Sequence, residues 1–232
     1  MQGVYRRTFS TGESPKALIE WKIPLLSAQW IMKHDFHVGG MTSLDLHGYS
    51  HYLRLGGNPP ICLYGQDAPA WLQKLKTDAR FIRRSDGLFA DKACGIEERE
   101  FGLFEDTGDE ISLNPWSWPI KISSSERAIL EALDELPKNE SFHNIDMIFE
   151  GLTTLRPKLL AELLASCQSV KVKRLFFVYA DKHAHAWRKH IDTSKIYMGS
   201  GDRALSKDGR LHPAYRVTVP ADLIPQGADN GA

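Results

Sequence analysis

The sequence contains no long apolar stretch. Its longest uninterrupted run of apolar residues is the segment 175–180 (LFFVYA), whereas a helix that crosses a membrane needs about 20 such residues. The apolar residues instead recur at alternating or helical spacing between turns rich in glycine and proline, which is typical of short strands and helices around a folded core. We therefore expect a protein with no membrane partner.

The length and the cysteine content of the chain narrow the class of protein further. The chain has 232 residues, enough for one large or two small folded units. Its three cysteines, Cys62, Cys94 and Cys167, are far apart and form no CxxC pair, which is typical of free thiols in a reducing compartment. Residues 1–7 carry charges but no following apolar stretch, unlike a secretory signal peptide. These features predict a cytoplasmic protein.

The residue periodicity predicts a mixed α+β fold in two packed modules, residues 13–122 and 123–232. Ser123-Ser-Ser-Glu126 is typical of a capping box and marks the boundary, and the prolines in 111–122 favour an edge strand. Strands are predicted over 3–9, 37–38, 60–64, 79–84, 99–104, 111–122, 195–199, 203–206 and 214–219. Helical segments are predicted over 24–33, from the glycine turn at 39–40 to Gly48, and over 69–75, 123–136, 142–151 and 156–166. The segment 170–182 fits either a strand, by Val170 and Val172, or a helix, by its apolar stripe, and we expect the helix.

Charge is balanced overall but segregated along the chain. Lys and Arg number 29, as do Asp and Glu, which argues against a protein that coats nucleic acid by bulk electrostatics. Residues 1–84 hold 11 basic and 6 acidic side chains, residues 85–151 hold 5 and 16, and residues 168–217 hold 11 and 4. The basic C-terminal block, interspersed with aromatic residues, fits a nucleic-acid surface, an acidic partner protein, or the chain's own acidic middle. Its candidate binding residues are Lys171, Lys173, Arg174, Arg188, Lys189, Arg203, Lys207 and Arg210.

Catalytic and cofactor motifs are weak, and we expect no enzyme, metal or cofactor. Val38-Gly39-Gly40 before a helix can present backbone amides to a phosphate, but no Gly-Lys-Ser/Thr follows, so a turn geometry is favoured. The nine histidines show no metal-ligand spacing with cysteines or carboxylates. A metal-dependent nuclease would require carboxylates and a lysine on adjoining strands. Asp106, Asp109, Glu110 and Lys121 are the candidates for that alternative.

Several segments together resemble the AbiEi antitoxin family of type IV toxin–antitoxin systems. No single motif is unique, but their order and spacing extend over nearly the whole chain. The segments are HVGGMTSLDLHG at 37–48, LYG at 63–65, EGLTTL at 150–155, SVKVKRLFF at 169–177, HAW at 185–187, GSG at 199–201 and YRVTVP at 215–220.

The resemblance implies a regulator with two activities. An N-terminal winged-helix domain would bind operator DNA and repress the operon, and a larger C-terminal region would neutralise a nucleotidyltransferase-like toxin, without a stable complex with it. Residues 1–12 resemble the last wing strand and linker of that DNA-binding domain, with Tyr5, Arg6 and Arg7 in the wing. The recognition helices that should precede this strand are missing from the sequence, so weakened operator binding is expected. A module that binds the toxin directly, through the acidic segment 85–151, is a further alternative.

Overall fold

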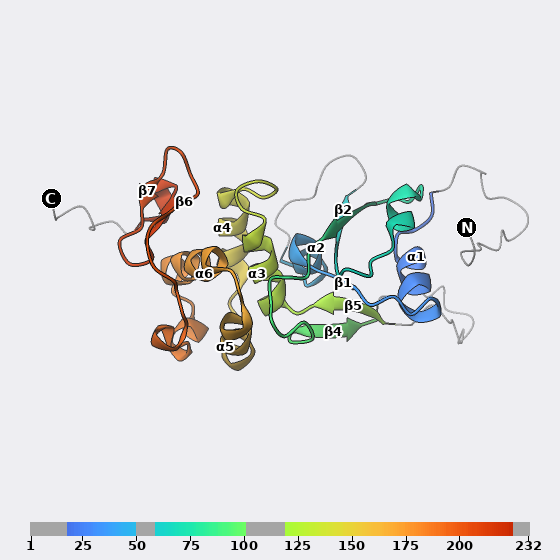
Figure 1. The fold of residues 1–232 in the computed structure, drawn as a ribbon, viewed down its shortest axis with the longest axis horizontal. Helices are drawn as coiled ribbons and strands as arrows, with labels where there is room; N and C mark the ends of the chain where they lie inside the picture. Colours follow the sequence, from blue (N-terminus) through green and yellow to red (C-terminus); the bar gives the residue numbers. More distant parts are fainter. Residues whose placement is uncertain (1–17, 50–58, 101–118, 225–232) are drawn as a thin grey trace, which may run out of the picture.

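The computed structural model describes residues 18–49, 59–100 and 119–224, and it arranges them as two groups of elements along one long axis (Figure 1). A five-stranded sheet with flanking helices forms one half, and four helices with a three-stranded sheet form the other. The expected α+β class is confirmed. Within these ranges, no helix is both long and apolar enough to cross a lipid bilayer. The expected strand at 3–9 lies outside the described residues.

The five-stranded sheet is mixed, with the strand order β3-β2-β1-β5-β4. Strand β1 runs antiparallel to β2 and parallel to β5, β2 is parallel to β3, and β4 is antiparallel to β5. The sheet therefore joins three strands that precede the acidic segment 85–151 to two strands that lie within it. The strands are β1 His37–Val38, β2 Pro60–Tyr64, β3 Arg80–Arg84, β4 Ile96–Arg99 and β5 Ile120–Ser123.

The two faces of this sheet are covered by different helices. On one face, Ile61, Leu63 and Phe81 belong to a buried cluster with residues of helix α1 (Lys22–Leu26) and of the 3-10 turn Ala70–Lys74. Helix α2 (Gly40–Leu46) covers the other face, where it also packs against α3. Alternate residues of each strand thus face different helices on the two sides of the sheet.

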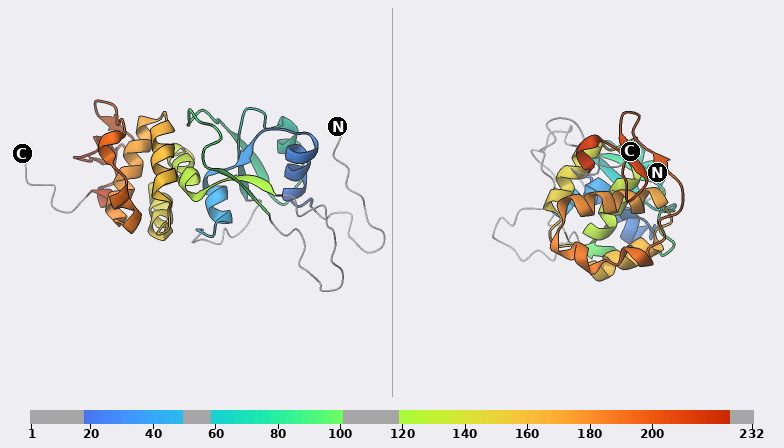
Figure 2. Two further views of the ribbon diagram at one scale, coloured as in Figure 1. Left: turned by 90° about the horizontal axis from the view of Figure 1, so that it is seen from below. Right: turned by 90° about the vertical axis from the view of Figure 1, so that its left-hand side faces the viewer.

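The second core is helical. Its helices are α3 Ser125–Asp134, α4 Phe142–Gly151, α5 Pro157–Ser166 and α6 Val170–His183. Helix α6 is buried over most of its length and lies centrally among the other elements of this half (Figure 2). The cluster of buried residues around it also includes Met41, Leu44 and Phe89 from the other half of the chain. The two halves therefore share apolar packing.

The helices of the second half form where their local signals predict them. Ser141 and Ser169 accept hydrogen bonds from backbone N–H groups in the first turns of α4 and α6, and Pro157 begins α5. Such caps satisfy helix N–H groups that otherwise lack partners. The predicted helices over 142–151, 156–166 and 170–182 are thus confirmed, as are the strands over 60–64 and 79–84.

The first turn of α3 differs from the predicted capping box. Ser124, not Ser123, is the N-cap residue and accepts the N–H of Arg127. Ser123 ends β5 and donates its hydroxyl to Glu131, while Glu126 accepts from the backbone and guanidinium of Arg156. The prediction of a helix here is correct, but the predicted reciprocal cap is wrong because tertiary partners take both side chains.

Several predicted strands are also corrected. Strand β5 lies between β1 and β4 instead of at an edge, and no proline follows Pro119 to interrupt its paired residues. Strand β4 ends at Arg99, where 99–104 was expected to begin. The helix expected over 24–33 is a short α-helix followed by a π-helical turn, Ser27–Ile31, and Lys33 follows with a positive φ of 60°.

The C-terminal sheet is smaller than predicted. Its order is β6-β8-β7, with β6 Arg203–Ala204, β7 Arg210–Leu211 and β8 Val217–Val219. The Asp208-Gly209 turn connects β6 and β7, but each pairs with β8 and not with the other. No strand forms over 195–199, because the 3-10 turn Thr193–Lys195 leads into irregular backbone whose carbonyls bind Arg174.

Candidate functional site

A buried carboxylate joins the two halves of the molecule. Glu131, on α3, is 1% exposed, and its two oxygens each contact two donors. Oε1 lies 3.0 Å from His37 Nε2 and 2.8 Å from Arg127 Nε. Oε2 accepts from the Gly40 N–H at 2.9 Å and from the Ser123 hydroxyl at 2.7 Å. A single side chain of the helical half thus binds β1, β5 and the start of α2. We call this set of contacts the Glu131 joint.

The surroundings of Glu131 favour its ionised form. Burial opposes ionisation, but the charge and hydrogen bond of His37 together with Arg127 and Ser123 outweigh it, so the pKa of Glu131 is lowered. Arg127 is equally buried and donates further to the carbonyls of Lys92 and Cys94. The Nε and Nη1 groups of Arg127 thus have acceptors, and further hydrogen bonds of this kind are what a buried ion pair requires.

The glycine turn that could bind a phosphate instead binds a carboxylate of the same chain. The N–H of Gly40 points at the Glu131 carboxylate, so an anion of the chain itself occupies the start of α2. Gly39 leaves no room for anything else there, since a Cβ atom on it would lie 2.2 Å from Glu131 Oε2. Gly40 has a positive φ of 55°, the turn geometry that the favoured interpretation expected, whereas Gly39 serves close packing.

Among the basic candidates, Arg174 is an interior residue. It is 2% exposed and donates to three carbonyl groups: Nε to Met198 at 2.8 Å, and Nη1 to Gly201 at 2.6 Å and Arg216 at 2.9 Å. These bonds fasten the C-terminal sheet to α6. Its charge therefore does not face a partner, and its inclusion in a binding surface is corrected.

Three further candidates are also engaged within the fold. Lys171 donates to the carbonyls of Asp134 and Leu136, and Lys173 is 6% exposed with its ammonium 5.9 Å from the centre of the Tyr197 ring. Arg188 pairs with Asp181 and lies over a buried aromatic ring. Helix α6 thus does not form the predicted basic face, because its cations are directed at neighbouring elements.

The remaining four candidates are exposed: Lys189 in the 3-10 turn Ala186–His190, and Arg203, Lys207 and Arg210 in the segment from β6 to β7. We call these last three residues the β6–β7 cations. Figure 1 shows β6 and β7 at the end of the molecule farthest from the five-stranded sheet. The eight predicted residues therefore divide into four that are bound within the fold, two of them buried, and four exposed cations. The wing residues Tyr5, Arg6 and Arg7 lie outside the described part.

The acidic middle segment pairs with both basic flanks. Glu135 contacts Arg84 at 2.9 Å, while Asp134 and Asp146 contact Lys171 and Lys182 of the C-terminal block at 3.2 and 2.7 Å. The charge segregation along the sequence is therefore partly cancelled in space, as one of the three open interpretations predicted. An acidic face directed at a toxin is correspondingly reduced.

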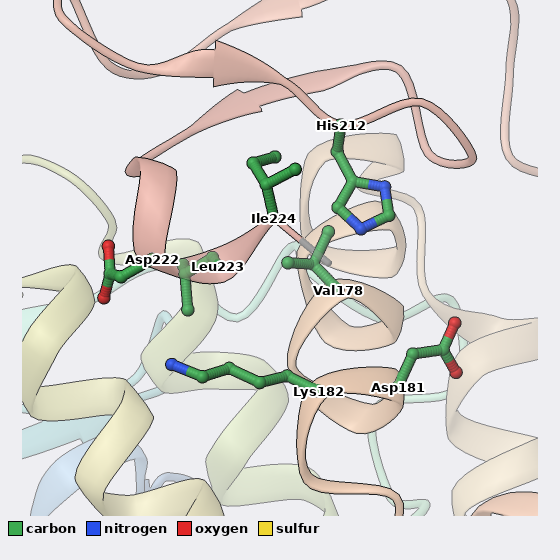
Figure 3. A pocket seen from close by; sticks show the side chains of 7 residues that line it. All are labelled: Val178, Asp181, Lys182, His212, Asp222, Leu223 and Ile224. Carbon is green, nitrogen blue, oxygen red and sulfur yellow. The ribbon is translucent and has the colours of Figure 1, made fainter. Parts of the chain in front are cut away.

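A cavity of about 280 Å³ lies between α6 and the 3-10 turn Ala221–Leu223 (Figure 3). Burial lowers the pKa of its His212, and Asp181 is bound by Arg188 and by the Tyr215 hydroxyl. Burial and then the bond to Asp181 raise the pKa of Tyr215 to about 12. The cavity presents mainly the apolar side chains of Val178, Leu223 and Ile224 and no reactive pair.

No chemistry of the nuclease alternative is visible in the described ranges. They contain no group of three or more His, Cys, Asp or Glu side chains placed to hold a metal ion. Lys121 is described and lies 3.2 Å from Asp35, whereas Asp106, Asp109 and Glu110 fall between the described ranges. Histidines 183 and 185 stack on each other and bind Asp146 and a backbone carbonyl.

These features define an α+β protein in which a mixed sheet is locked onto a helical core that carries exposed cations at its far end. The chain matches, over residues 59–220, the family model described as transcriptional regulator, AbiEi antitoxin, type IV TA system. Because this match covers well over half of the chain, the protein belongs to the AbiEi antitoxin family, and the predicted resemblance is confirmed.

A solved structure shares the fold. The protein in "Crystal structure of RV2827C protein from Mycobacterium tuberculosis" superposes with a TM-score of 0.54 at 13% sequence identity, covering 88% of this chain and 70% of that chain. At this identity the similarity shows the fold alone. A comparison with curated proteins gives no match.

Sequence reasoning missed the Glu131 joint entirely. Arg127 and Glu131 are four residues apart on a helix, a spacing typical of exposed ion pairs. Half of the ten residues of α3 are polar, so nothing in the sequence distinguishes this pair from an exposed one. Its burial becomes evident only when α2, β1 and β5 are placed around it.

Proposed function

We propose that this chain is the antitoxin of a type IV pair, which neutralises a nucleotidyltransferase-like toxin without a stable complex and, with its winged-helix domain, represses its own operon by binding operator DNA. Membership of the AbiEi family supports the regulatory assignment. The fold presents exposed cations at one end of the molecule, which is compatible with both activities. That the partners of this chain are such a toxin and an operator is part of the proposal.

The observation that carries the DNA-binding part is the position of the β6–β7 cations. All three are exposed, and the side chains of Arg203 and Lys207 make no ion pair within the described ranges. Tyr197, 76% exposed, precedes β6 in sequence. Exposed cations together with an aromatic ring fit a phosphate backbone.

The experiment is a charge reversal restricted to this segment. Reversing Lys171, Lys173 and Arg174 would remove internal anchors, so Arg203→Glu, Lys207→Glu and Arg210→Glu are combined instead. If each cation contacts one phosphate, the slope of log K against log salt falls by about 2.7 in magnitude. The control reverses Lys76, Lys138 and Lys158, which are also exposed. Equal slopes for the two triple variants would contradict the assignment.

Antitoxicity is tested separately by co-expressing the chain with the toxin encoded beside it and scoring growth. The proposal predicts rescue without co-purification of the two proteins. Stable co-purification would favour the direct toxin-binding alternative, and failure of a folded chain to rescue would refute antitoxicity. Growth of the β6–β7 variant then shows whether the same surface serves both activities.

A further inference from the structure

A second pocket lies on the sheet face that α2 covers, between β2, β3 and the segment after α3. Strands β2 and β3 are parallel and place Pro60 beside Arg80, Cys62 beside Ile82, and Tyr64 beside Arg84. Alternate residues of a strand share a face, so these three pairs form one floor. The pocket has a volume of about 200 Å³ and is lined by Met41, Pro60, Cys62, Tyr64, Arg80, Ile82, Arg84, Glu135, Asn139 and Glu140.

Two buried donors in this lining lack hydrogen bonds. In the described part of the chain, only three buried side-chain polar atoms have no hydrogen-bond partner, and two of them, Tyr64 Oη and Arg84 Nε, belong to this pocket. Arg84 Nε lies 2.9 Å from Glu135 Oε2, close enough for an ion pair but not aligned for a hydrogen bond. Burial raises the pKa of Tyr64 well above its ordinary value, so its hydroxyl stays protonated and donates. Leaving such donors unpaired is costly.

The charged groups of the lining are balanced. Arg80 and Arg84 project from β3, whereas Glu135 and Glu140 follow α3. Arg84 and Glu135 pair with each other, and Arg80 is exposed and has no partner within the described ranges. Arg80 on the strands and Glu140 after α3 therefore favour a ligand with no net charge, with its oxyanion toward the strands and a cationic donor toward Glu140.

We propose that this pocket binds a free α-amino acid. Its carboxylate would accept from Tyr64 and Arg84 and pair with Arg80, its ammonium would face Glu140, and its side chain would lie on Ile82. The pocket is smaller than the roughly 300–1,000 Å³ of sites for drug-sized molecules, so small and medium apolar side chains fit best. A phosphate would place a negative charge beside the two glutamates, and a cation would place a positive charge beside the arginines.

The test measures thermal unfolding of the full chain with each standard amino acid in turn. A ligand present at about 100 times its Kd should raise Tm by roughly 5–10 °C. We expect this shift from one or a few apolar amino acids, and not from their amides or N-acetyl derivatives, which lack one of the two charges. Absence of any shift at millimolar concentrations would overturn the proposal.

Two variants separate a ligand site from a water-filled gap. Tyr64→Phe removes only the unpaired hydroxyl, so the unliganded Tm should stay equal or rise while affinity falls about tenfold, the effect of losing one good hydrogen bond. Arg80→Gln should weaken binding further, and Arg83→Gln, on the same strand but facing away from the pocket, should not. Equal ligand shifts in all three variants, or an unliganded Tyr64→Phe protein that is clearly less stable, would show that ordered water already satisfies the hydroxyl.

Discussion

Replacing Glu131 by Gln tests the joint between the two halves with the smallest possible change in shape. The carboxylate accepts two hydrogen bonds on each oxygen. An amide offers only one accepting oxygen, so its NH₂ group must face either His37 and Arg127 or Gly40 and Ser123. Two donors therefore lose their acceptor in either orientation, and the buried Arg127 loses its counter-charge.

The magnitude follows from the burial of the pair. Arg127 and Glu131 are each 1% exposed, and removing one partner of a fully buried pair costs about 3–5 kcal/mol. For a chain of this size each kcal/mol corresponds to roughly 2–4 °C in Tm. We therefore expect Glu131→Gln to lower Tm by roughly 6–20 °C at neutral pH.

Calorimetry combined with urea unfolding provides the measurement. Glu162→Gln is the matched control, because Glu162 is exposed in the middle of α5 and such changes stay within about 0.5 kcal/mol. A Glu131→Gln protein less than about 1 kcal/mol below the unmodified chain would refute the reasoning, since the unpaired-charge cost alone exceeds that value.

Three further outcomes follow from the same contacts. Because the folded pKa of Glu131 is lowered, its stabilisation is present above the unfolded value of about 4.3 and lost as pH falls through the folded value; the deficit of Glu131→Gln should therefore shrink in a pH series below that point. Gly39→Ala should cost about 1–3 kcal/mol by urea unfolding, because the backbone there is extended but the new Cβ meets Glu131. Arg174→Met should cost about 2–4 kcal/mol by the same measurement, since three carbonyls lose their donor, whereas Arg203→Met should change little.

Local signals predicted much of the helical half. The residue pattern placed helices over 142–151 and 156–166 and favoured one over 170–182, and the caps at Ser141 and Ser169 and the proline at 157 act on the first turns of these helices. Residues 195–199 alternate like a strand, yet Met198 presents its carbonyl to Arg174 from a helix more than twenty positions earlier. That interaction has no local signature.

The candidate site was predictable only in part for the same reason. A lysine or arginine in a basic block has the same appearance whether it binds a partner or a carbonyl of its own chain. Only the fold separates Arg174, which anchors the C-terminal sheet, from Lys207, which is exposed. The pocket beside Tyr64 depends on strand register and on residues of the segment after α3, and neither can be read from spacing.

The Glu131 contacts also link two regions that lie far apart in the molecule. Because the donors come from β1, β5 and α2, a rotation of the helical half against the sheet would break these hydrogen bonds. The spacing between the pocket on β2 and β3 and the cations at β6–β7 is therefore coupled to one buried side chain. Binding of a single macromolecule at both ends would depend on that side chain, although it touches neither end.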